Sequence, residues 1–122
     1  MARRLTNHER AMTAQAILDI DKFWADIFST TTLNDLNYCD LFTQMWLSKD
    51  TPLPKTELYG FMPNISQRTA VKYIQQAIDE GMLEECDCEH DRRVRLVSLT
   101  KDCEAKVKQF LDYTLRRFHE NQ

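Results

Sequence analysis

The chain has 122 residues, enough for one domain with a modest core, and its 43% hydrophobic and 29% charged residues exclude a disordered or membrane-embedded protein. Its 16 basic and 19 acidic residues give a net charge of −3, so any affinity for nucleic acid must come from a local basic surface. No apolar run approaches the roughly 18 residues of a membrane span, and a polar segment follows the basic N-terminus where a signal peptide would be apolar, so we expect a cytoplasmic protein without a membrane partner.

Two amphipathic helices are predicted in the first half of the chain. The first runs from about Thr6 to Phe28, and its wide, aromatic face favours contact with a partner subunit, although an ordinary core helix has the same pattern. Its apolar positions recur at spacings of three and four: Met12, Ala16, Ile17, Ile20, Phe23, Trp24, Ile27 and Phe28. The second runs from about 33 to 47, with Thr32 and Asp35 as a capping arrangement. Its expected buried side consists of Leu36, Cys39, Phe42, Met45 and Trp46.

Two shorter helices follow across a turn. We expect residues 49–54 to form a turn and Pro54 to be the first residue of a helix over KTELYGF, since proline fixes φ and its missing N–H is not needed there. After a second turn at 60–64, Ser66 suits the N-cap of a fourth helix that Gly81 stops. The two helices and their turn have the dimensions of a helix-turn-helix.

The fourth helix has an apolar and a polar face. Its expected buried residues are Ala70, Val71, Ile74, Ala77 and Ile78, and its polar residues are Gln67, Arg68, Lys72, Gln75 and Gln76. Gln pairs bidentately with adenine and Arg with guanine, while Lys72 and the Ser66 hydroxyl suit phosphates. The polar face is therefore a candidate DNA-reading surface, although a merely solvated helix face has a similar composition.

After Gly81 the apolar period changes from helical to alternating. This change predicts a strand over Met82–Cys86, a charged tip at 89–92 and a second strand. The second strand contains Val94, Leu96, Val97 and Leu99. Thr100 then opens a last helix with the apolar stripe Cys103, Val107, Phe110, Leu111, Leu115 and Phe118. Together with the first helix, it offers a second long apolar face.

Four cysteines stand at positions 39, 86, 88 and 103, and without a secretory signal we expect reduced thiols. Cys39 and Cys103 fall on apolar stripes, where cysteine behaves as a small hydrophobe. Cys86 and Cys88 precede His90, and C-x-C on a strand sends both sulfurs to the same face. This segment has three interpretations: structural residues, a redox pair, or part of a zinc site that lacks a fourth ligand. We assign no metal site and no cofactor.

Several short signals in order resemble the MarR family of winged helix-turn-helix regulators. They are Thr56-Glu57-Leu58, Ile65-Ser66 with Thr69, Glu80-Gly81-Met82-Leu83, Asp91-Arg92-Arg93 and Val97-Ser98-Leu99-Thr100. The resemblance covers about residues 33–100, and its most specific part is the Asp-Arg-Arg tip followed by the Leu-Thr helix start. It implies a mainly α single domain over 1–122 with a small β-hairpin wing. Dimerisation helices at about 1–30 and 100–122 would then flank a DNA-binding lobe at about 33–100.

The resemblance also implies roles for individual residues. Ser66, Gln67, Arg68, Thr69 and Lys72 would belong to the DNA-binding surface, with the last four facing the major groove. Arg92 would enter the minor groove, and Asp91 would hold the tip by accepting hydrogen bonds from a neighbouring arginine. Arg93 and Arg95 would stiffen the wing or reach phosphate. The expected function is transcriptional regulation by a homodimer on double-stranded DNA, with a possible small-molecule effector.

The sequence also allows a different class of function. Five acids lie near the tip, Glu84, Glu85, Asp87, Glu89 and Asp91, and they favour a winged-helix protein-interaction module such as an anti-repressor or adaptor. An enzyme is not expected, because the chain contains no glycine-rich phosphate loop, nucleophile motif or metal triad. Its three histidines, at positions 8, 90 and 119, are far apart in sequence.

Overall fold

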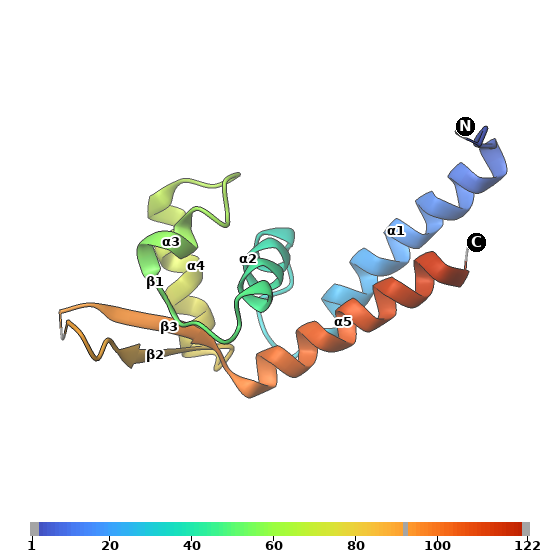
Figure 1. Cartoon of the computed structure of the whole chain (residues 1–122). Helices are drawn as coiled ribbons and strands as arrows, with labels where there is room; N and C mark the ends of the chain where they lie inside the picture. Colours follow the sequence, from blue (N-terminus) through green and yellow to red (C-terminus); the bar gives the residue numbers. More distant parts are fainter. Residues whose placement is uncertain (1–2, 92, 121–122) are drawn as a thin grey trace.

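A computed structural model describes residues 3–91 and 93–120. The chain forms an arm of two long helices and a lobe that carries a β-hairpin (Figure 1). In chain order, the elements are α1 (Asn7–Ile27), α2 (Leu36–Leu47), β1 (Leu53–Pro54), α3 (Lys55–Tyr59), α4 (Gln67–Asp79), β2 (Leu83–Asp87), β3 (Arg95–Leu99) and α5 (Lys101–Glu120). The predicted fold class, mainly helical with a small β-hairpin wing, is confirmed. None of the helices within the described residues is long and apolar enough to cross a membrane.

The arm consists of α1 and α5, which lie side by side and project away from the lobe (Figure 1). Thr6 caps α1 through a capping box with Glu9, as its hydroxyl accepts the Glu9 N–H and the Glu9 carboxylate accepts the Thr6 N–H. Between the helices, the rings of Phe23 and Tyr113 stack with centroids 4.1 Å apart. The predicted bounds of the first helix are thus correct to within a residue.

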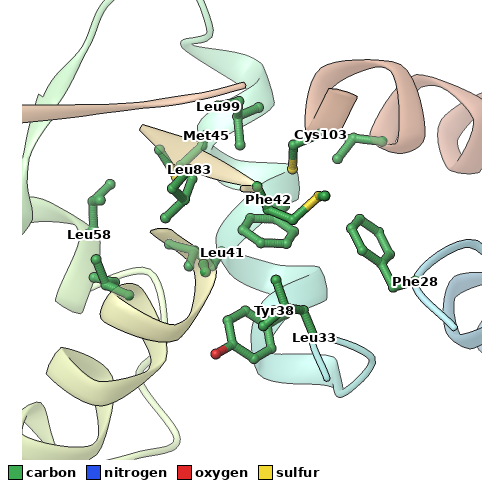
Figure 2. Packing of buried hydrophobic residues seen from close by; sticks show 14 of the residues in the cluster. Phe28, Leu33, Tyr38, Leu41, Phe42, Met45, Leu58, Leu83, Leu99 and Cys103 are labelled. Carbon is green, nitrogen blue, oxygen red and sulfur yellow. The ribbon is translucent and has the colours of Figure 1, made fainter. Parts of the chain in front are cut away.

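The core lies where the arm meets the lobe. Figure 2 shows Phe28 from the end of α1 and Cys103 from α5 among apolar side chains of α2, α3 and the sheet. Burial raises the pKa of the Cys103 thiol, which is fully covered, so this cysteine is a packing residue as its apolar stripe predicted. The arm and the lobe therefore share one core.

The sheet has three antiparallel strands in the order β1-β3-β2. β2 and β3 form the predicted hairpin, with Leu83 opposite Leu99 and Asp87 opposite Arg95. The prediction of a plain turn at 49–54 is wrong in part, because β1 pairs with β3 there, and Pro54 is the N-cap of α3 instead of its first residue. A two-residue edge strand containing proline gives no alternating pattern from which to predict it.

The predicted buried side of α2 is wrong at Leu36, which is 61% exposed, while Tyr38 and Leu41 are buried. Helix α2 also begins at Leu36 instead of Leu33, and its cap is Asp35, whose carboxylate accepts the Tyr38 N–H at 3.1 Å. The Asp35 cap therefore places the helix start three residues after the predicted one. Because Tyr38 is on the buried side of α2, Leu36 lies on the exposed side.

Candidate nucleic-acid interface

Helix α4 presents the polar face that the sequence predicts. Ser66 is its N-cap and accepts the Thr69 N–H at 3.2 Å, while the two hydroxyls are hydrogen-bonded to each other at 3.0 Å. The side chains of Gln67, Arg68 and Lys72 are exposed, whereas Thr69 is half-buried. Neither Arg68 nor Lys72 forms an ion pair in the part of the chain that the structure describes. These two cations lie one turn apart, on the N-terminal half of the helix.

The prediction that α4 buries Val71 is wrong. Val71 is 44% exposed, whereas Ala70, Ile74 and Ala77 are buried and Ile78 is half-buried. The covered stripe of α4 is narrower than the apolar pattern suggests, because it packs mainly against the short helix α3 and strand β2. Val71 therefore belongs to the outward surface, beside the polar side chains.

Two tyrosines attach α4 to the start of α2. The Tyr73 hydroxyl donates to Asp35 Oδ2 at 2.6 Å, and the Tyr38 hydroxyl donates to the Tyr73 carbonyl oxygen at 2.8 Å. Their rings stack with centroids 4.7 Å apart and an interplanar angle of 16°. The bond to Asp35 raises the pKa of Tyr73, and burial raises that of Tyr38, so both phenols stay protonated donors at neutral pH.

A second attachment lies at the C-terminal end of α4. The Glu80 carboxylate accepts the Thr32 N–H at 2.9 Å, the Thr32 hydroxyl and the Gln76 amide. The hydrogen bond from the Thr32 side chain, followed by that from Gln76, lowers the pKa of Glu80. The sequence pattern suggested that Thr32 helps to cap α2, and this prediction is wrong. Thr32 instead holds the segment before α2 against the end of α4. The helix stops after this contact, where Gly81 has φ +79°.

In the wing, defined here as β2, β3 and the residues between them, the tip is closed by Asp91. Its carboxylate accepts the Arg93 backbone N–H at 3.0 Å and the Arg93 Nε–H at 3.2 Å, and these bonds lower the pKa of Asp91. The Val94 N–H donates to the Asp91 carbonyl oxygen at 3.0 Å. Arg92, predicted as the minor-groove residue, lies outside the described residues.

The base of the wing is held by Glu85, whose side chain is only 21% exposed. One of its oxygens lies 2.6 Å from Lys55 Nζ and the other 3.3 Å from Arg95 Nη1. The hydrogen bond from Lys55 lowers the pKa of Glu85, and Arg95 adds to this effect. Arg95 is therefore paired within the protein, while Glu84, Asp87 and Glu89 are exposed.

The cysteine segment forms the outer end of β2 and the start of the tip. Cys86 is exposed and Cys88 is half-buried, and all four cysteines are free thiols. Among the residues that the structure describes, no three His, Cys, Asp or Glu side chains are grouped to hold a metal ion. We assign no chemistry to this segment.

The fold is that of MarR-type winged helix-turn-helix regulators. The heme sensor protein PefR, solved in complex with heme and carbon monoxide, aligns with a TM-score of 0.61 at 19% identity over 90% of this chain and 73% of that chain. A mutant MarR from E. coli, solved in complex with operator DNA, aligns with a TM-score of 0.59 at 13% identity. The alignment covers 91% of this chain and 77% of that chain. A transcriptional regulator from Thermotoga maritima aligns with a TM-score of 0.61 at 10% identity over 94% of this chain and 78% of that chain.

No protein-family model matches the sequence, and no curated protein matches it. At such low identities, the structural likeness establishes the fold and leaves the function to be argued from the residues. The predicted resemblance to the MarR-type winged helix is confirmed at that level.

Proposed function

We propose that this protein is a cytoplasmic homodimeric transcriptional regulator that binds double-stranded DNA with α4 in the major groove. The observation that supports it most is the pair of exposed cations, Arg68 and Lys72, on the N-terminal half of α4, neither of them in an ion pair among the described residues. In a helix-turn-helix, this half of the second helix contacts base edges. The E. coli MarR structure with operator DNA supports the same use of the fold.

Each residue of the α4 surface suits one kind of DNA contact. Arg68 can pair bidentately with guanine and Gln67 with adenine, while the Lys72 ammonium suits a phosphate. Ser66 and Thr69 lie at the positive end of the helix dipole, where a phosphate is favoured. Because both hydroxyls already bond within the cap, we expect these two residues to orient the helix start more than to read bases.

The wing would supply the contacts beside the major groove. Arg92 at the tip is our candidate for the minor groove, where a narrow groove attracts arginine. Asp91 would keep the tip in shape through Arg93, as in the hydrogen bonds described above. Arg93 and Arg95 already share their charge with Asp91 and Glu85, so we expect these two residues to add less affinity than the cations of α4.

Exposed apolar side chains on the outer part of the arm are the observation that supports a dimer. Five large apolar side chains there are between 44% and 62% exposed: Leu5, Ile17, Leu18, Leu115 and Phe118. A hollow of about 470 Å³ lies among Leu5, Ile17 and Phe118. A second copy related by a two-fold axis would cover these side chains and place two α4 helices about one DNA turn apart. An effector would then act by changing the proportion of dimers with the right α4 separation.

A second candidate function is a winged-helix protein-interaction module. The observation that favours it is the acidic wing, where Glu84, Asp87 and Glu89 are exposed and the described arginines pair with the wing's own acids. Such a surface repels phosphate and suits a basic protein partner.

Fluorescence anisotropy with labelled duplexes separates the two functions. The full chain is titrated into a pool of genomic fragments and into a random duplex at several salt concentrations. We expect binding with log Kd rising linearly with log salt, because contacts to phosphate release counterions. Binding that is absent, or independent of salt, would exclude DNA recognition and favour the protein-interaction module. Sedimentation equilibrium on the same sample measures whether the chain is a dimer.

A further inference from the structure

Val71 is an apolar residue on an otherwise polar surface. It lies at the middle of α4 with its side chain 44% exposed, and its surface neighbours on the helix are Gln67, Arg68 and Gln75, all exposed. The other exposed large apolar side chains among the described residues lie elsewhere. Five are at the end of the arm, and Leu36 and Leu47 stand at the two ends of α2.

The position of Val71 restricts what it can meet. A side chain at this point faces whatever Arg68 and Gln75 face, since residues three and four apart lie on the same side of a helix. In the major groove of B-DNA, the base-pair edges present hydrogen-bonding groups and one apolar group, the C5 methyl of thymine. A branched valine in a helix also has one strongly preferred rotamer, so it presents a fixed apolar surface at little entropic cost.

We propose that Val71 is a specificity-determining residue that packs against the C5 methyl group of one thymine in each half-site. This inference rests on the proposed function and names part of the sequence that α4 reads. The thymine lies next to the base contacted by Arg68, because Val71 follows Arg68 by three residues on the same side of the helix. The Val71 side chain is shorter than that of Arg68, so the contact requires α4 to sit close to the floor of the groove.

The experiment begins with the duplex that the full chain prefers, selected from a random library. Each thymine in that duplex is then replaced singly by deoxyuridine, which removes only the methyl group. We expect one thymine per half-site at which this replacement weakens binding about fourfold, the effect of one buried methyl-sized group, and about fifteenfold when both half-sites are replaced.

Two substitutions at position 71 connect this effect to the side chain. In Val71→Ser the loss caused by deoxyuridine should disappear, whereas in Val71→Ile it should persist. The matched control is Leu47→Ser, another exposed apolar residue but at the far end of α2, which should leave the loss unchanged. Thermal unfolding of each variant verifies that the exposed position tolerates the change. Comparing the losses as a double-mutant cycle isolates the contact between the side chain and the methyl group.

The outcomes separate this inference from the proposed function. Salt-dependent DNA binding with no thymine sensitive to deoxyuridine, or a loss that is equal in the wild type and Val71→Ser, overturns the role of Val71 and leaves the regulator intact. If no duplex is bound at all, the proposed function itself fails, and the assignment of Val71 fails with it.

Discussion

Helix α4 and the wing contain the same kinds of charged residue but use their acids differently. On α4, Glu80 accepts hydrogen bonds from Thr32 and Gln76, and Asp79 accepts one from Gln75, so the acids bind neutral groups. In the wing, Asp91 binds Arg93, and Glu85 binds both Arg95 and Lys55. The described cations of α4 are therefore available to an outside partner, while Arg93 and Arg95 of the wing already have one.

This difference shows why charge counts alone do not locate a DNA-binding surface. Arg93 or Arg95 on a phosphate would already have its charge partly neutralised by a carboxylate, so the added contact changes the free energy little. An exposed cation without such a partner displaces counterions from the DNA, which strengthens binding. We therefore expect most of the affinity of the described residues to come from α4, although α4 and the wing are similar in size.

The largest expected effect is the loss of Arg68. Arg68→Ala should weaken binding to the preferred duplex about tenfold to a hundredfold, because a bidentate contact to guanine is lost. Arg93→Ala removes the same charge from the wing and serves as the matched control. It should weaken binding much less, since Arg93 already pairs with Asp91. Anisotropy titrations at one salt concentration measure both; equal losses would contradict the difference between α4 and the wing.

A smaller effect should follow from releasing the two cations that pair with Glu85. Glu85→Gln removes the carboxylate that Lys55 and Arg95 share, so both become available to phosphate. We expect binding to tighten about twofold to fivefold at low salt, with a steeper dependence on salt. The control is Glu84→Gln, which removes the same charge from an exposed neighbour. If the two variants tighten binding equally, net charge is the cause and the pairing is irrelevant.

The sequence predicted the elements whose signals are local. Ser66 as the N-cap, the polar face of α4 and the stop at Gly81 follow from side chains within one or two helical turns, and the structure has all three. The exposure of Val71 was not predictable in this way. A helical pattern gives the direction of the buried side, but the width of the covered stripe depends on the size of the elements packed against it.

The attachments of α4 were also beyond sequence reasoning. Tyr73 and Asp35 are separated by 38 residues, and Thr32 and Glu80 by 48, so no local spacing relates them. The Thr32 and Asp35 pattern even suggested a different partner, namely each other, because a threonine three residues before an acid is a common helix start. The two partners, Glu80 for Thr32 and Tyr73 for Asp35, come together only in the folded chain.

The smallest expected effect is on the pH dependence of stability, and it tests the hydrogen bonds that Glu80 accepts from Thr32 and Gln76. The pKa of Glu80 is lowered in the folded state, first by the Thr32 side chain, so the ionised carboxylate stabilises the fold above the pKa of the unfolded chain. That contribution should be lost as the pH falls below about 4.5. Glu80→Gln should lower the thermal midpoint at pH 7 by a few degrees at most, since the carboxylate is partly solvated.

The same variant should approach the wild type as the pH falls through the lowered pKa of Glu80, where the wild-type carboxyl becomes protonated and its bonds from Thr32 and Gln76 weaken. Circular dichroism melts between pH 3 and 7 measure the difference. Asp79→Asn is the matched control, because Asp79 binds only Gln75 within the same helix among the described contacts. If the curves of Glu80→Gln and the wild type stay parallel over this range, the ionised carboxylate does not hold α4 to the segment before α2. The orientation of α4 would then depend on Tyr38, Tyr73 and the core alone.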